Sequence, residues 1–382
     1  MLKEATDFEG DSSVKEEHLL VRDTGLRESI LRPSLPPALQ EKNPFPSTRY
    51  YGSKKKQLQW LRDEFVLVKG QSVLDAFGGT GAVTHLWRSL GWEVTYNDVF
   101  TFNSVSARAL FSDSTRLYSE KVVQEFLGDV APVHGFISRT FEGLFYYREE
   151  NEWLDGLLMN LRGQEEQFRC LLLHCLFQAC LQKRPFNLFH RANLHLRDSK
   201  VPVKFGNRVT WAKPFRELML TAYREVARMQ TSAIYLPVNV LKPMSADSIP
   251  GKYDVVYIDP PYFHQSRTTE PYAQRYHFLE GLARYDEWPH LVDMESPIRQ
   301  IRNGVVPEWS RKVDFQQNLV ALISKYRKSK IILSYVSGEY PCEQDLIETF
   351  RGYFDDVRVS RRSFSRVLSK KKFIEILISG EP

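Results

Sequence analysis

The stretch from Gln71 to Asp98 constrains the fold more than any other part of this chain, because four elements follow one another in it. Residues 71–77 are a largely apolar run that predicts a buried strand, and Gly78-Gly79-Thr80-Gly81 comes directly after it. Residues 82–90 are helix-like, Gly91 ends them, and residues 92–96 predict a second strand closing on Asn97-Asp98. A strand, a helix and a strand in this order are typical of a parallel sheet. The pattern therefore predicts an α/β fold.

The rest of the chain adds elements to this sheet. One strand ends at Asp259, another covers residues 330–335, and residues 356–363 and 372–378 alternate like a closing antiparallel pair. Helices are predicted over residues 55–65 and 314–326 and through most of 104–230, which also holds a basic loop. We expect a sheet domain from residues 49–103 and 231–382 and a helical insert from 104–230. Residues 1–48 mix charges with prolines, which predicts a mobile or loosely docked arm; a partner-binding arm is the alternative.

Composition narrows the class of protein and its compartment. The 382 residues are 42% hydrophobic and 13% aromatic, as in a folded globular protein, and no apolar stretch is long enough to cross a membrane. The first residues lack the apolar core of a signal peptide. Cys170, Cys175 and Cys180 diverge by about 140° per step of a predicted helix, so together with Cys342 they indicate unpaired thiols in a reducing cytoplasm. The net charge of +5 is compatible with nucleic acid without requiring it.

The tetrad Asp259-Pro260-Pro261-Tyr262 at the end of an apolar strand indicates a specific chemistry. An amino group on an aromatic ring is a poor nucleophile, because its lone pair is delocalised into the ring. A carboxylate and a backbone carbonyl that accept its two hydrogens hold the nitrogen in a more reactive state. The two prolines stiffen the backbone and remove N–H donors, and the tyrosine ring offers a surface for stacking. These residues predict methyl transfer to an exocyclic amine.

The glycine turn is a candidate cofactor site. Glycines after a first buried strand let a ligand approach the backbone, and the next helix presents free N–H groups. Asp98, at the end of the second strand, lies where a ribose diol can bind. The dinucleotide spacing G-x-G-x-x-G is absent, and residues 75–81 instead resemble the S-adenosylmethionine loop of methyltransferases. A glycine turn in an ordinary α/β domain would look similar, but the tetrad at a neighbouring strand end favours the cofactor site.

From about Arg49 to Ile378, the chain resembles the Dam-like family of DNA N6-adenine methyltransferases. The opening motif departs from the family pattern, since Tyr50 stands where tryptophan is common and Ser53 replaces a glycine. The motifs that carry the resemblance are Arg49-Tyr50-Tyr51-Gly52-Ser53-Lys54, the glycine loop with Asn97-Asp98, Asn193-Leu194-His195-Leu196-Arg197 with Val203-Lys204-Phe205-Gly206-Asn207, Ala246-Asp247-Ser248, the tetrad, and a terminal hairpin with Arg361-Arg362-Ser363 and Lys370-Lys371-Lys372-Phe373-Ile374-Glu375-Ile376-Leu377.

The resemblance implies a Rossmann-like methyltransferase sheet with helices on both faces, a catalytic sheet domain and a largely helical DNA-recognition insert. It implies S-adenosylmethionine as cofactor and double-stranded DNA as substrate. His264, His277 and His290 have no metal-ligand spacing, and we expect no metal site. The residues expected to bind the cofactor are Tyr50, Lys54, Asp75, Phe77, Gly79, Gly81, Asp98, Asp247 and Asp259.

The expected mechanism places the reacting groups in the tetrad. The target adenine is rotated out of the helix, because its N6 is inaccessible while stacked and paired. Asp259 and the carbonyl of Pro260 accept the two N6 hydrogens, and Tyr262 stacks on the base. No covalent enzyme intermediate is required, and positioning supplies most of the acceleration.

The predicted DNA-binding region is the segment 183–213, which holds eight Lys or Arg against one acid, with interleaved aromatic residues. Basic residues neutralise phosphates, and Arg, Asn and aromatic side chains reach base edges. The alternative is a solvated loop that happens to be basic. The basic run from Arg361 to Lys372 could grip the DNA backbone or form a charged hairpin tip. The candidate DNA contacts are Arg191, Asn193, Arg197, Lys204 and Asn207.

Several alternatives stay open at this point. Tyr272, Tyr276, Phe278, Tyr285 and Trp288 either line the pocket of the flipped base or form an aromatic core. The rival functions are an adenine methyltransferase for structured RNA, a protein-glutamine methyltransferase, and a catalytically silent DNA-binding relative. The resemblance also implies a monomeric prokaryotic or phage enzyme in the cytoplasm, associated with the nucleoid. It would serve a restriction–modification or genome-marking system, with a cognate restriction endonuclease as one candidate partner.

Overall fold

The computed structural model describes residues 45–48, 50, 52–111, 118–185, 189–198, 208–232, 235–266, 272–302, 308–365 and 372–382. Most of the predicted arm lies outside the described residues. Its last part is fixed by contacts: Phe45 is buried, its carbonyl accepts a hydrogen bond from Lys55 Nζ at 2.7 Å, and Ser47 N donates to Glu225 at 3.0 Å.

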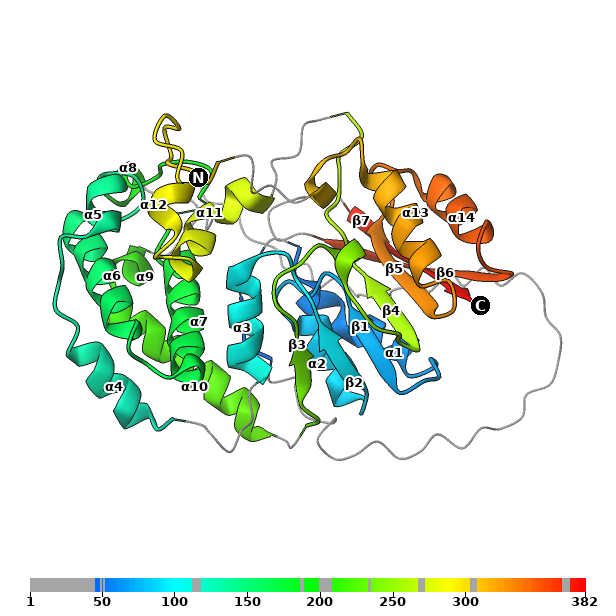
Figure 1. The fold of residues 1–382 in the computed structure, drawn as a ribbon, viewed down its shortest axis with the longest axis horizontal. Coiled ribbons are helices and arrows are strands. Elements are labelled where there is room, and N and C mark those ends of the chain that lie inside the picture. Colours follow the sequence, from blue (N-terminus) through cyan, green and yellow to red (C-terminus); the bar gives the residue numbers. More distant parts are fainter. Residues whose placement is uncertain are drawn as a thin grey trace, which may run out of the picture.

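A sheet of seven strands forms the centre of the described structure, in the order β3-β2-β1-β4-β5-β7-β6 (Figure 1). The strands β1 to β5 are parallel, and β7 runs antiparallel between β5 and β6. The predicted α/β sheet and its closing antiparallel pair are therefore confirmed. The strands are β1 (Ser72–Asp75), β2 (Glu93–Tyr96), β3 (Val238–Val240), β4 (Val255–Ile258), β5 (Lys330–Val336), β6 (Asp356–Ser365) and β7 (Lys372–Glu381).

Helices cover both faces of the sheet, as predicted. Successive strand residues point to opposite faces, and each face belongs to a different apolar cluster. Val73 packs with α1, α2 and α3, whereas Leu74 packs with α13 and α14. On the first face Phe65 stacks on Trp87, with 4.0 Å between the ring centroids. These elements are η2 (Lys54–Gln57), α1 (Leu58–Phe65), α2 (Ala82–Ser89), α3 (Thr101–Phe111), η4 (Ala246–Ser248), η6 (Glu308–Ser310), α13 (Phe315–Lys325) and α14 (Glu343–Arg351).

A helical body lies beside the sheet (Figure 1). Its central helix, α7, buries the three cysteines expected there. Two helices that follow the tetrad in sequence, α11 and α12, join the same body, because Phe278 and Trp288 both pack against Phe141. The body is therefore built from two separate stretches of chain. Its helices are α4 (Glu120–Gly128), α5 (Phe136–Thr140), α6 (Arg148–Leu161), α7 (Glu166–Gln182), α8 (His195–Asp198), α9 (Arg208–Ala212), α10 (Phe215–Ser232), α11 (Tyr272–Ala283) and α12 (Trp288–Leu291).

The parallel register brings three chemically important segments together. β1 pairs with β2 on one side and with β4 on the other, so the loops that follow these strands leave the same edge of the sheet. Those loops are the glycine turn, Asn97-Asp98 and the tetrad. None of the described helices combines the length and the apolarity needed to cross a bilayer.

Candidate active site

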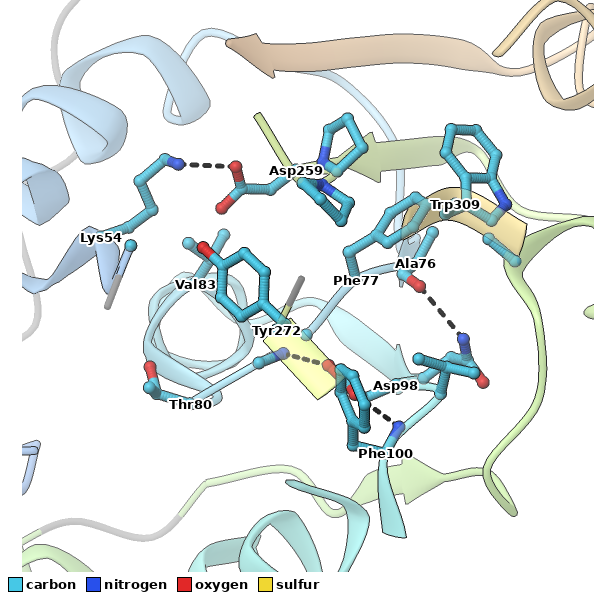
Figure 2. Close-up of a pocket in the computed structure, with 18 of the residues that line it drawn as sticks. Lys54, Ala76, Phe77, Thr80, Val83, Asp98, Phe100, Asp259, Tyr272 and Trp309 are labelled. Atoms are coloured by element: carbon cyan, nitrogen blue, oxygen red, sulfur yellow. Dashed lines mark hydrogen bonds and ion pairs between the residues drawn. The ribbon is translucent and has the colours of Figure 1, made fainter. Parts of the chain in front are cut away.

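The three loops surround a cavity of about 930 Å³, measured to include space open to solvent. Figure 2 shows Lys54 and Asp259 on one side of this cavity and Asp98 beside the glycine turn on another. The floor and walls also include aromatic rings. The cavity is lined by Tyr50, Gly52, Ser53, Lys54, Ala76, Phe77, Gly78, Gly79, Thr80, Ala82, Val83, Asn97, Asp98, Val99, Phe100, Met244, Ser245, Ala246, Tyr257, Asp259, Pro260, Pro261, Tyr262, Tyr272, Trp309 and Ser310.

The glycines of the turn are required for two reasons, lack of space and backbone conformation. A Cβ at Gly78 would lie 2.0 Å from the ring of Tyr96, and Gly79 has a φ of +50°. The hydroxyl of Tyr96 donates to the carbonyl of Gly79 at 2.8 Å, which fixes the turn against β2. At the start of α2, Gly81 has a φ of +78°, which favours glycine. At Gly78 and Gly79 the turn therefore presents bare backbone to the cavity.

Asp98 connects the turn to the start of α3. One carboxylate oxygen accepts from Gly79 N at 2.9 Å and the other from Phe100 N at 2.8 Å (Figure 2). Burial raises the pKa of this carboxyl, and the hydrogen bonds from Phe100, Asn103 and Gly79 oppose the shift. These three hydrogen bonds leave one of about four lone-pair sites of the carboxylate, which can accept from a ligand hydroxyl in the cavity.

The tetrad carboxylate is held by two donors. Oδ1 of Asp259 lies 2.6 Å from Lys54 Nζ and accepts from the hydroxyl of Tyr262 at 2.7 Å. Burial raises the pKa of Asp259, the Lys54 ammonium opposes this shift, and Glu375 adds to it. Burial alone would lower the pKa of Lys54, but the two carboxylates outweigh it and raise it. Among the described residues nothing hydrogen-bonds to Oδ2 of Asp259, whose side chain borders the cavity.

Aromatic rings form two walls. Tyr50 stacks on the fully buried Tyr276, with 4.7 Å between centroids and 6° between planes, and Asn103 Nδ2 donates to the Tyr50 hydroxyl at 3.3 Å. On the other side Phe77 meets Trp309 edge to face at 4.9 Å (Figure 2). Flat apolar walls with a carboxylate at each side suit a ligand that contains a planar base and a sugar.

Residues 50–298 match the family of D12 class N6 adenine-specific DNA methyltransferases. This chain belongs to that family. The D12 class enzyme is also 23% identical over 311 residues to the Type II methyltransferase M2.HphI of Haemophilus parahaemolyticus, an alignment that covers 79% of this chain and 86% of the relative. The protein is thus a sequence-specific adenine methyltransferase of DNA, the first of the functions predicted from the sequence.

In this D12 class enzyme, most residues predicted for the cofactor and for catalysis lie together, and three do not line the cavity. Asp75 is buried behind the turn, where it accepts from the Thr84 hydroxyl at 2.6 Å. Gly81 packs against the ring of Phe111. Asp247 is exposed in η4. The predicted residues that line the cavity are Tyr50, Lys54, Phe77, Gly79, Asp98, Asp259, Pro260 and Tyr262.

The predicted DNA contacts separate into three kinds. Arg191 is exposed. Arg197 points inward, since its side chain is 5% exposed and it pairs with Glu150 at 2.6 Å, a position that favours a structural role over a DNA contact. Asn193 is also buried. Lys204 and Asn207 lie outside the described residues. On the hairpin, Arg361 pairs with Glu343 and Arg362 is exposed, whereas residues 366–371 are not described.

The structure separates the aromatic residues for which the sequence left pocket and core open, and it places two residues that had no predicted role, Trp309 and Glu375. Tyr272 and Trp309 line the cavity, whereas Phe278 and Trp288 belong to the apolar core. Glu375 lies 3.1 Å from Lys54 and is 1% exposed. The available signal was a single acid inside the apolar run from Phe373 to Ile378, because a lone charge in a buried strand usually has a partner.

Proposed function

We propose that the cavity binds S-adenosylmethionine together with a target adenine that has left the DNA helix. The family assigns the reaction, and the lining of the cavity supports where it takes place. Carboxylates, bare backbone of the glycine turn and aromatic rings line it, a combination of a few polar groups with flat apolar walls that is typical of ligand sites. The N6 atom of a stacked and paired adenine is out of reach, so the base must be flipped to enter.

The residues around the glycine turn fit the cofactor. Gly78 and Gly79 let it approach the backbone, Asp98 can accept from its ribose hydroxyls, and Tyr50 or Phe77 can contact its adenine ring. Bound S-adenosylmethionine supplies a methyl group on a positively charged sulfur. Asp75 and Gly81 support the turn from behind.

The target amino group is assigned to the tetrad, and the observation that carries this is the state of Asp259. Lys54 and Tyr262 hold its Oδ1, while Oδ2 borders the cavity with no hydrogen bond from a described residue. Oδ2 and the carbonyl of Pro260 accept the two N6 hydrogens, which keeps the nitrogen lone pair available for the methyl carbon. The ring of Tyr262 borders the same space and contacts the base.

The setting is also a proposal. The relative from Haemophilus parahaemolyticus is named a Type II methyltransferase, which supports a role in a prokaryotic or phage restriction–modification system. The D12 enzyme would then act as a monomer on duplex DNA in the nucleoid and protect the sites of a cognate endonuclease. Sequencing of modified bases in DNA from cells that express the protein tests this setting and gives the recognition sequence.

Substitution of the tetrad carboxylate tests the assignment of the site. Asp259→Ala should abolish transfer of labelled methyl groups to duplex DNA, with binding of the same duplex largely retained. Asp356→Ala, which removes an exposed carboxylate paired with Arg358, is the matched control and should methylate normally. Full activity of Asp259→Ala would refute the assignment.

A further inference from the structure

A second carboxylate lies behind Asp259. Glu375 comes from β7, and its Oε1 lies 3.1 Å from Lys54 Nζ and accepts from the hydroxyls of Tyr262 at 3.0 Å and Ser334 at 2.8 Å. Its side chain is 1% exposed, and it does not line the cavity. Glu375 therefore acts on the reaction only through the residues that it holds.

The two carboxylates share the same two donors. Lys54 Nζ and the Tyr262 hydroxyl each contact both Asp259 Oδ1 and Glu375 Oε1. The ammonium has three hydrogens and can serve both acids, but the hydroxyl has one and can donate to a single acid at a time. One cation between two anions leaves this buried group with a surplus negative charge. An ion pair of Asp259 with Lys54 alone, without Glu375, would instead be neutral.

We propose that Glu375 is a positioning residue for methyl transfer: it fixes Lys54 and Tyr262 against one oxygen of Asp259 and keeps the other oxygen a strong acceptor. The proposal rests on the function proposed for Asp259. Methyl transfer uses the N6 lone pair to form the new N–C bond, while the electron pair of the broken C–S bond stays on sulfur. N6 thereby gains a positive charge and releases one proton, which Oδ2 of Asp259 accepts and later passes to water.

The surplus negative charge favours this step, because it lies next to a nitrogen that becomes positive. The titratable groups around Asp259 are Lys54 of η2, Glu375 of β7, Tyr262, Tyr257 of β4 and Asp75 of β1. Glu375 raises the pKa of Asp259, and Lys54 lowers it. Loss of the Glu375 charge should therefore lower the pKa of Asp259, and activity that needs its ionised form should persist to lower pH.

The test uses the intact enzyme with Glu375→Gln and Glu375→Asp, and Glu381→Gln as a control on the same strand, where Glu381 forms a pair with Lys330. Glu375→Gln should lower kcat on the order of 10- to 100-fold, as loss of an orienting partner commonly does, with KM for DNA nearly unchanged. It should also move the acidic limb of the kcat–pH profile to lower pH. Glu375→Asp keeps the charge, so its limb should stay in place while kcat falls. Glu381→Gln should match the wild type.

A binding measurement gives a readout that does not depend on turnover. Duplexes that carry the mapped recognition site, with either adenine or purine at the target, are titrated without cofactor. The wild type should prefer adenine, whose amino group meets Asp259, and Glu375→Gln should weaken that preference. An unchanged preference and an unshifted pH limb in Glu375→Gln would overturn the role of Glu375 alone. Full activity of Asp259→Ala would overturn the proposed function itself.

Discussion

The two halves of this protein each contain a buried ion cluster, and the clusters have opposite compositions. At the edge of the sheet, one cation, Lys54, lies between two anions, Asp259 and Glu375. In the helical body, one anion, Glu150, lies between two cations, Lys183 at 2.8 Å and Arg197 at 2.6 Å. Both clusters are largely withdrawn from water, so neither is a weak surface pair.

The clusters differ most in how they use their hydrogen-bonding groups. In the helical body, Tyr147 N donates to Glu150 at 3.0 Å, and both cations also donate to the carbonyl of Trp211 at 3.0 Å. At the sheet edge, Oδ2 of Asp259 accepts no hydrogen bond from a described residue. A saturated cluster holds the fold, whereas an unsaturated one beside a cavity is available for chemistry.

Two buried aspartates that lie outside these clusters, Asp155 and Asp75, show the same contrast. Asp155 of α6 accepts from Gly135, Ile137 and Ser138 N and from the Tyr285 hydroxyl, at 2.6–3.2 Å. Asp75, behind the glycine turn, leaves Oδ1 without a hydrogen bond among the described residues. Asp75 thus keeps an unsatisfied oxygen at the sheet edge, whereas both oxygens of Asp155 in the helical body accept hydrogen bonds.

The largest expected effect is on the stability of the helical body. Glu150→Gln leaves Lys183 and Arg197 buried without their anion, which should lower the free energy of unfolding by about 3–5 kcal/mol. Denaturant unfolding measures this change. The folded fraction should keep its kcat, because no member of this cluster lines the cavity. A kcat that falls in the fully folded variant would show that the two clusters are coupled.

Lys54→Met should affect kcat more than stability, the reverse of Glu150→Gln. It removes the donor that fixes Asp259 Oδ1, and loss of such a preorganised group should lower kcat by about 100- to 1,000-fold. Stability should fall less than in Glu150→Gln, since burial raises the pKa of Asp259 and its carboxyl can take up a proton. Lys183→Met is the matched lysine in the other cluster and should lower stability with kcat retained. Equal losses of stability in both lysine variants would contradict the comparison.

Local pattern predicted six of the seven strands in the described sheet and missed the short edge strand β3. The strand before the tetrad and the helix predicted at 314–326 appear as Val255–Ile258 and Phe315–Lys325, since apolar runs and turn residues fix such elements within a few positions. Local pattern could not predict whether an individual charged side chain points outward to solvent or inward to a partner. Arg197 stands in a basic segment, yet it turns inward because Glu150, 47 positions away in sequence, accepts its guanidinium. Glu375 likewise lies beside Lys54 only because β7 pairs with β5, a contact between distant parts of the sequence. α11 and α12 likewise join the helical body through apolar contacts that no local pattern specifies.

Asp75 should make the free energy of unfolding depend on pH. Burial raises the pKa of Asp75 to about 7, whereas an unfolded aspartate titrates near about 4. Between these values the folded protein binds more protons than the unfolded chain, so its stability falls as pH rises, by up to about 1.4 kcal/mol per unit. The difference in unfolding free energy between wild type and Asp75→Asn should therefore shrink from pH 5 to 7 and level off above. A difference that stays constant would give Asp75 an ordinary pKa.

The smallest expected effect distinguishes Arg191 from Arg197, both in the predicted DNA-binding segment 183–213. Arg191 is exposed, so if it meets a phosphate, Arg191→Ala should weaken DNA binding and reduce the slope of log K against log salt by about 1. Arg197 forms a buried ion pair with Glu150. Arg197→Ala should therefore lower the free energy of unfolding and leave the salt slope of DNA binding unchanged in the folded protein. Arg224→Ala is the control, because Glu120 already neutralises this exposed arginine. Binding measured across a salt series distinguishes these outcomes, and a reduced slope for Arg197→Ala would mean that the insert rearranges on DNA to release its buried cation.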